Sequence, residues 1–174
     1  MEQWRGGSLN MDGGIHEIPL VGVTGRLWVC GKHRIAPDPD EVLSTTSATH
    51  VVCLVKEFEL ADRFDDYIVW LRRSGRATWA PTSDFGFDPL DTVFPLFEEI
   101  FARMVSGESV VVHCAAGKGR AGTFASALCV MAGMTVDDAV AHVRRHRPGA
   151  GPEAGEQRAI LDELATRLAR RDRP

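Results

Sequence analysis

The feature that most constrains this chain is a short apolar strand that leads through a glycine-rich loop into a helix of small residues, over residues 109–123. A loop at such a junction turns successive backbone N–H groups inward and meets the positive end of the helix dipole, so it is suited to hold a phosphate dianion. Gly117, Gly119 and Gly122 allow the tight turn and the close approach of the backbone to the oxygens. The residues predicted to contact phosphate form one run: Ala115, Ala116, Gly117, Lys118, Gly119 and Arg120.

Two side chains at the ends of this loop add reactivity to the predicted phosphate site. The amides and the helix dipole that hold an anion also stabilise the thiolate of Cys114, and a thiolate is a nucleophile. Arg120, six positions later, presents a planar guanidinium that suits two phosphate oxygens and the charge that develops when phosphorus is attacked. The sequence therefore predicts Cys114 and Arg120 as a catalytic pair.

Three other interpretations of the same loop are weaker. The Gly117-x-Gly119-x-x-Gly122 pattern fits a dinucleotide site, but that fold requires a second strand ending in an acid about 20 residues on, where this chain opens a helix at Thr135. A nucleoside-triphosphate loop requires a glycine where Val112 stands and a hydroxyl residue where Gly119 stands. A core cysteine beside an unrelated surface arginine does not explain three glycines in register.

The run His113-Cys114-x5-Arg120 resembles the signature loop of the protein tyrosine and dual-specificity phosphatases. The later Arg-Pro-Gly-Ala segment at residues 147–150, followed by Gln157, is similar to the small atypical dual-specificity branch of that family. The resemblance implies an α/β fold with a mostly parallel central sheet flanked by helices, in which the Cys-x5-Arg loop joins a central strand to a helix. It also implies a phosphatase that uses no cofactor and no metal.

The resemblance assigns further roles outside the loop. Asp84, which precedes Cys114 by 30 positions, resembles the family's general acid in spacing and in its Pro-x-x-Asp setting, with Asp88 as the reserve candidate. Such an acid is needed because the leaving alkoxide or phenoxide must take up a proton. Gln157 is expected to hold the water that hydrolyses the phosphocysteine, and an exposed helical glutamine is the competing interpretation. His113 is expected to turn its ring into the carbonyls and amides of the loop.

The chain departs from the family pattern directly after the arginine. The family usually has Ser or Thr there, where the hydroxyl donates to the cysteine sulfur, and this chain has Ala121. A hydroxyl donor stabilises sulfur as a leaving group, so we expect weaker stabilisation when the phosphocysteine breaks down.

Length and charge restrict the remaining possibilities. The 174 residues suffice for one domain, predicted over residues 15–174 behind a flexible N-terminal arm at residues 1–14. With a formal net charge of −4, no broad surface for nucleic acid is expected, so anion binding must be local. The sequence shows neither a signal-peptide core nor a transmembrane run, which predicts a cytoplasmic protein. The four cysteines lack Cys-x-x-Cys spacing, and Cys53 and Cys129 are expected in the core.

Hydrophobic periodicity predicts the elements around the loop. The acidic segment 57–66 is expected to form a solvated face. The cluster Arg144, Arg145 and Arg147 is expected to complement the negative end of a helix dipole, and substrate binding is its other interpretation. Strands are expected at residues 25–31, 50–55 and 77–80 and before Cys114, and helices after residue 37, at 67–73, 90–104 and 121–131, after 135, and around 161–168.

These features lead to one principal hypothesis and two alternatives. The principal hypothesis is a cysteine-dependent phosphomonoesterase that dephosphorylates phosphotyrosine in proteins and, because short loops make a shallow cleft, also phosphoserine and phosphothreonine. Lys118 adds a cation where phosphoinositide phosphatases resembling this family often carry lysine, so an inositol phosphate or phosphoinositide substrate is one alternative. A catalytically weak, phosphate-binding pseudophosphatase is the other, and only Ala121 favours it.

Overall fold

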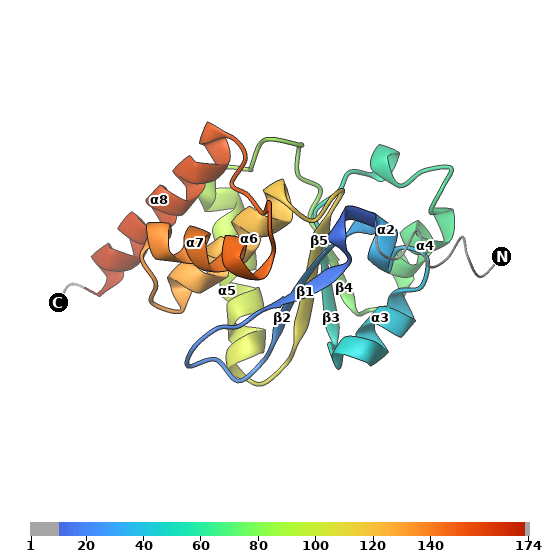
Figure 1. The fold of residues 1–174 in the computed structure, drawn as a ribbon, viewed down its shortest axis with the longest axis horizontal. Coiled ribbons are helices and arrows are strands. Elements are labelled where there is room, and N and C mark those ends of the chain that lie inside the picture. The colour runs from blue at the N-terminus through green and yellow to red at the C-terminus, as the bar shows by residue number, and fades with distance from the viewer. Residues whose placement is uncertain (1–10, 173–174) are drawn as a thin grey trace.

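The computed structural model describes residues 11–172 and is built around one five-stranded sheet (Figure 1). All neighbouring strands are parallel except the first two, which are antiparallel. The expected mostly parallel α/β fold is therefore confirmed. The strands are β1 (Ile15–Ile18), β2 (Leu27–Gly31), β3 (His50–Cys53), β4 (Ala77–Trp79) and β5 (Val110–Cys114), in the spatial order β1-β2-β5-β3-β4.

Strand β5 occupies the centre of the sheet, and every one of its residues is buried. Val110, Val111 and Val112 pair with β2 on one side and with β3 on the other. A continuous run of β-branched residues suits a strand that is covered on both faces. Cys114 ends β5, at the carboxyl edge of the sheet, where open parallel sheets bind their ligands.

Helices cover both faces of the sheet (Figure 1). Helix α6 is buried over nearly its whole length between the sheet and its helical neighbours, which holds the loop that precedes it in place. Within residues 11–172, no helix is long and apolar enough to cross a membrane. One face carries α5 (Leu90–Val105), α6 (Gly119–Met131), α7 (Val136–His146) and α8 (Gly155–Arg171), and the other carries α2 (Lys32–Ile35), α3 (Pro39–Thr46) and α4 (Asp65–Arg73).

The start of the described chain differs from the expected flexible arm. Residues 1–10 lie outside the described part, but Met11–Gly13 form a short 3-10 turn that leads directly into β1. The sequence does not predict β1 because only Ile18 of its four residues is fully buried, which leaves no clear alternation. The strand becomes evident only beside β2, where Ile15 lies opposite Cys30. Residues 11–14 therefore have defined structure, in contrast to the expectation.

Candidate active site

The loop from Cys114 to Arg120, called the cysteine loop below, has its carbonyl groups bonded on the outer side. The carbonyls of Ala116 and Gly117 both accept hydrogen bonds from the guanidinium of Arg147, the first at 3.0 Å. The Ala115 carbonyl accepts a hydrogen bond from the first N–H of α2 at 2.9 Å. The Lys118 carbonyl accepts hydrogen bonds from two backbone N–H groups at 2.8 Å each, and one of these N–H groups lies within α6.

This bonding pattern determines where the N–H groups of the loop point. In a trans peptide the N–H lies opposite the C=O, so four carbonyls held outward turn the following four N–H groups inward. Those N–H groups belong to Ala116, Gly117, Lys118 and Gly119. Helix α6 begins at Gly119 and adds the positive end of its dipole. The cysteine loop therefore has the donor arrangement that binds an anion.

Two glycines of this region are required for different reasons. Gly117 has a φ of +67°, and an added Cβ would lie 2.2 Å from the carbonyl carbon of Cys30 in β2. This position serves the turn of the loop. At Gly122 an added Cβ would instead lie 2.6 Å from the backbone nitrogen of Gly151. Gly122 therefore allows the segment after α7 to pack on α6, a role that differs from the phosphate approach expected from the sequence.

Arg120 is 1% exposed, and most of its donors are already engaged by protein groups. Nη1 and Nη2 each donate to the carboxylate of Glu59 at 2.8 Å, and Nη1 also donates to the Thr82 carbonyl at 3.0 Å. This two-pronged pairing fixes the plane of the guanidinium. Nε has no hydrogen-bond partner within residues 11–172 and lies 3.7 Å from Oδ1 of Asp84. The Nε–H of this buried arginine therefore remains available to a ligand.

The loop between β4 and α5 carries both candidate general acids. Asp84 is exposed, lies close to Arg120, and accepts a hydrogen bond from the Phe85 N–H at 3.1 Å. Phe85 has a φ of +59°, which is strained for a large side chain and is a conformation found at functional sites. Asp88 lines a cavity of about 360 Å³ together with residues of β4 and α5, and it forms no ion pair with Arg120 within residues 11–172. The geometry therefore favours Asp84 over Asp88 as the group that faces a bound anion.

His113 is fully buried behind the cysteine loop. Its Nδ1 lies 3.3 Å from the Cys114 carbonyl, and its Nε2 lies 2.7 Å from the hydroxyl of Tyr67 in α4. A carbonyl can only accept, so we assign the proton to Nδ1 and let Tyr67 donate to Nε2. Burial lowers the pKa of His113 to about 4, so the ring is neutral near neutral pH. One ring nitrogen thus meets a loop carbonyl as expected, whereas the other is bound to α4.

A comparison with known protein families identifies the family of this chain. Residues 23–163 match the family described as Swiss Army Knife protein, DSP-PTPase phosphatase domain. The chain belongs to this family. The matched region includes the central strand, the cysteine loop and the loop that carries the two candidate acids.

Solved structures of phosphatases share the fold of this domain. The chain is similar to Tk-PTP in the active form, with 28% sequence identity and a TM-score of 0.66, over 84% of this chain and 98% of that chain. It is also similar to a mutant form of Tk-PTP, with 33% identity and a TM-score of 0.65, over 76% and 85% of the two chains. PTPMT1, solved in complex with PI(5)P, shares the fold at 14% identity and a TM-score of 0.71, over 91% and 99%. The protein is therefore a phosphatase of the dual-specificity type.

Gln157 of this phosphatase domain is fully buried, so the interpretation of an exposed helical glutamine is wrong. Its Oε1 accepts from the Glu153 N–H at 2.7 Å and lies 3.4 Å from the Thr123 hydroxyl oxygen, whose proton goes to the Gly119 carbonyl. Its Nε2 has no partner among the described residues. An added Cβ on Gly119 would lie 3.4 Å from this nitrogen. A free, buried donor therefore lies next to the first residue of α6.

Sequence reasoning misses two residues that hold the site. Glu59 lies in the acidic segment expected to be solvated, yet its side chain is 14% exposed and binds Arg120. Burial alone would raise the pKa of Glu59. Its hydrogen bonds, above all those from Arg120, outweigh burial and lower the pKa, so the carboxylate stays ionised. Glu57, two positions earlier, remains exposed, and nothing in the spacing distinguishes the two. Arg147 is the second residue that holds the site, and the Arg-Pro-Gly motif is the sequence signal that points to it.

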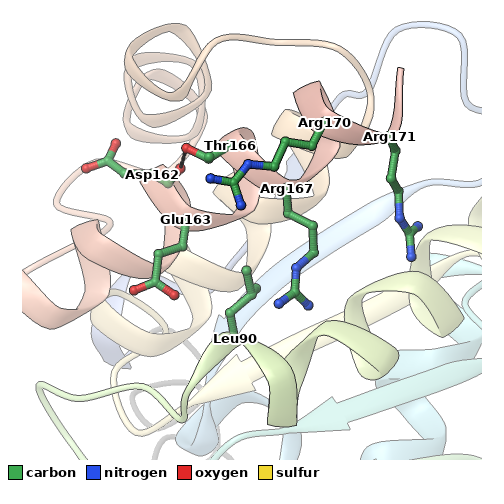
Figure 2. Close-up of a pocket in the computed structure, with 7 residues that line it drawn as sticks. All are labelled: Leu90, Asp162, Glu163, Thr166, Arg167, Arg170 and Arg171. Atoms are coloured by element: carbon green, nitrogen blue, oxygen red, sulfur yellow. Dashed lines mark hydrogen bonds between the residues drawn. The ribbon is translucent and has the colours of Figure 1, made fainter. Parts of the chain in front are cut away.

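A hollow of about 610 Å³ lies apart from the phosphatase site, between the start of α5 and the last turns of α8 (Figure 2). Figure 2 shows three arginines of α8 and two acids of the same helix around it. Arg167 pairs with Asp91, and Arg171 pairs with Glu98 at 2.6 Å. No residue of the cysteine loop lines this hollow. Its ion pairs make it a charged surface between two helices, separate from the site.

Acidification is expected to destabilise the domain through His113. In the unfolded chain His113 takes up a proton near pH 6.5, whereas in the folded domain it stays neutral down to about pH 4. The free energy of unfolding therefore falls as the pH decreases between these values. The loss from pH 7 to pH 5 is expected to be roughly 2 kcal/mol for this group. The lowered pKa values of His16 and His50, both caused mainly by burial, act in the same direction.

Urea unfolding at pH 7 and pH 5 measures this effect. In His113→Asn the amide replaces Nδ1–H but does not titrate, so the difference in unfolding free energy between the two pH values should shrink by the His113 share. An equal difference in the two proteins would show that His113 does not carry the effect.

Proposed function

We propose that this domain is a cysteine-dependent phosphomonoesterase that acts on phosphotyrosine in proteins, and also on phosphoserine and phosphothreonine, through a phosphocysteine intermediate. The observation that carries the proposal is a loop with inward N–H groups beside a buried arginine whose Nε–H has no partner among the described residues. Cys114 begins this loop, so a phosphate held there lies next to the thiol. Substrate identity, the intermediate and the residue roles below all belong to this proposal.

In the first step the Cys114 thiolate attacks phosphorus, and the bond between phosphorus and the leaving oxygen breaks. Asp84 in its protonated form transfers its proton to that oxygen, which leaves as a phenol or an alcohol. The inward N–H groups and Arg120 stabilise the charge on the other three oxygens. Glu59 keeps the Arg120 guanidinium in one plane and so acts as a positioning residue.

In the second step water attacks the phosphocysteine. The sulfur–phosphorus bond breaks, Cys114 leaves as a thiolate, and inorganic phosphate is released. The Asp84 carboxylate accepts the proton that water loses, which returns the acid to its starting form. The free Nε2 of Gln157 beside the loop supports a role in holding this water.

Acidic groups around the loop support a protein substrate over an inositol with several phosphates. Oε2 of Glu153 would lie 2.6 Å from an added Cβ on Gly119, in the cysteine loop itself. Oε2 of Glu156 would lie 3.3 Å from an added Cβ on Gly86, in the loop that carries Asp84. Carboxylates at both places repel any second phosphate next to the one being cleaved.

An inositol phosphate or phosphoinositide is the second candidate substrate, and Lys118 is the observation that favours it. Its Cε and Nζ would lie 3.6 and 3.8 Å from an added Cβ on Gly149, so its ammonium group lies along the segment after α7. This long side chain can turn toward a second phosphate without a change in the backbone. PTPMT1, which shares the fold, was solved with such a lipid headgroup.

A substrate panel tests the proposal and its alternatives. We expect hydrolysis of nitrophenyl phosphate in the presence of a chelator, and a higher kcat/KM for phosphotyrosine peptides than for inositol phosphates or phosphoinositide vesicles. The reverse preference would favour the second candidate. Tungstate binding without any turnover would favour a pseudophosphatase.

The alanine at position 121 is expected to make breakdown of the phosphocysteine rate-limiting. The nearest hydroxyl in sequence, on Thr123, donates to the Gly119 carbonyl at 2.7 Å and does not replace the missing donor. Ala121→Thr and Ala121→Ser should therefore raise the steady-state rate by about ten- to a hundredfold. Rapid-mixing assays with a nitrophenyl ester should show a stoichiometric burst in the wild type that shrinks in these variants.

The matched control is Ala121→Val, which has the shape of threonine without the hydroxyl. It should keep the burst and the slow steady rate of the wild type. If the wild type shows no burst, or if valine accelerates turnover as much as threonine does, the hydroxyl explanation is wrong.

A further inference from the structure

Arg147 lies behind the cysteine loop and is 1% exposed. It follows the last residue of α7, and its guanidinium reaches back to a segment 30 residues earlier in the chain. Nε donates to the Gly117 carbonyl, and Nη2 donates to the Ala116 carbonyl at 3.0 Å. These two contacts account for half of the outward-bonded carbonyls that shape the loop. The expected role at the helix dipole therefore does not describe this residue.

The other side of the same guanidinium holds the beginning of the described chain. Nη2 donates to the Asp12 carbonyl at 2.9 Å, and Nη1 donates to the Gly14 carbonyl at 3.1 Å. Nη1 also lies 2.8 Å from Nδ1 of His16, which accepts because an arginine can only donate. Strand β1, which contains His16, is itself anchored on β2. One side chain thus connects residues 12–16 with the cysteine loop.

Among the described residues, the hydrogen-bond acceptors of Arg147 include no carboxylate, and the nearby Asp12 carboxylate acts on its charge only through space. All of its hydrogen bonds within the described chain go to backbone carbonyls or to an imidazole nitrogen. A buried charge is costly unless it is well bonded, and its field extends further in the protein interior than in water. This charge therefore adds to the positive potential that a phosphate in the loop experiences.

We propose that Arg147 is a positioning residue for the phosphate site and that it couples the segment 12–16 to phosphate affinity. The Ala116 carbonyl shares a peptide unit with the Gly117 N–H, and the Gly117 carbonyl shares a peptide unit with the Lys118 N–H. Holding these two carbonyls outward therefore holds both N–H groups inward. The inference rests on the proposed function, because it requires a phosphate group in the cysteine loop.

Tungstate titrated calorimetrically into the full-length chain tests the first half of the proposal. Arg147→Met should weaken tungstate binding about tenfold or more, because the two peptide units lose charged hydrogen bonds that orient them. Arg147→Lys keeps the charge but cannot hold two carbonyls at once, so it should restore only part of the affinity. Wild-type affinity in either variant would overturn the positioning role.

Leu164→Ala serves as a control for lost stability. Leu164 is fully buried in α8, and its truncation should destabilise the fold through a cavity while tungstate affinity stays at the wild-type level. If this control loses affinity as much as Arg147→Met does, the effect of Arg147 is only structural and the proposal fails.

Two truncations test the coupling and remain decisive if Arg147→Met does not fold. A chain lacking residues 2–10 keeps the carbonyls of Asp12 and Gly14, whereas a chain lacking residues 2–13 loses the first of them. Tungstate affinity should fall severalfold in the longer truncation relative to the shorter one. In the Arg147→Met background the longer truncation should not lower tungstate affinity any further, because both changes act through one side chain. Equal affinities of the two truncations, or full additivity, would contradict the coupling.

The rate of Cys114 alkylation by iodoacetamide at a fixed pH gives a readout that a purely structural residue does not move. If Arg147 orients the N–H groups toward the thiolate, the rate falls in Arg147→Met and stays constant in Leu164→Ala. An unchanged rate in Arg147→Met would speak against the proposal. Failure of the proposed function looks different, since the wild type would then not hydrolyse nitrophenyl phosphate, whereas failure of this inference leaves a wild type that both binds tungstate and turns over.

Discussion

Cys114→Ser is expected to abolish turnover while tungstate still binds. A serine hydroxyl does not ionise near neutral pH, so the nucleophile is lost although the size of the side chain is kept. The inward N–H groups and the free donor of Arg120 do not depend on the sulfur, so the anion site persists. We expect kcat for nitrophenyl phosphate to fall by more than about 10⁴-fold, with a calorimetric Kd for tungstate near that of the wild type.

Cys129→Ser is the matched control for this variant. Cys129 is a buried free cysteine in α6, outside the cysteine loop, so its substitution should leave kcat unchanged. Activity close to wild type in Cys114→Ser would remove this residue from the mechanism. Simultaneous loss of tungstate binding would show that the loop had collapsed. The loss of turnover would then not support Cys114 as the nucleophile.

Asp84→Ala is expected to slow the cleavage of poor leaving groups far more than that of good ones. An alkoxide needs a proton as it leaves, whereas nitrophenolate hardly does, so the loss should be about 10²- to 10⁴-fold for alkyl phosphates and much smaller for nitrophenyl phosphate. A series of aryl and alkyl esters measures this, because the slope of log kcat/KM, which reports formation of the phosphocysteine, against leaving-group pKa should steepen in the variant.

Asp88→Ala provides the comparison within the same loop. Asp88 lines the cavity between β4 and α5 and, unlike Asp84, forms no ion pair with Arg120 within residues 11–172, so its removal should leave the slope unchanged. If Asp88→Ala steepens the slope and Asp84→Ala does not, the two acids exchange roles. Unchanged slopes in both variants would mean that neither acid protonates the leaving group.

Much of the fold was predictable because its signals are local. Val110 to Val112 form an uninterrupted run of β-branched apolar residues, which suits a strand buried on both faces, and β5 is that strand. The glycine-rich run after Cys114 predicts a tight turn into a helix, and α6 begins within it. Strand β1 was not predictable, since its half-exposed residues carry no pattern of their own and its pairing with β2 stabilises it.

The sequence by itself determined the cysteine loop, the position of Cys114 and Arg120 within it, and the mostly parallel sheet that carries it. Only the tertiary structure decided which groups hold that loop in shape. Glu59 binds Arg120 across 61 positions of the chain, and Arg147 reaches the Asp12 carbonyl across 135. Gln157 is likewise buried by packing between α8 and α6, although Glu156 directly before it is exposed. Contacts of this kind depend on how distant segments pack, which no local pattern of residue types encodes.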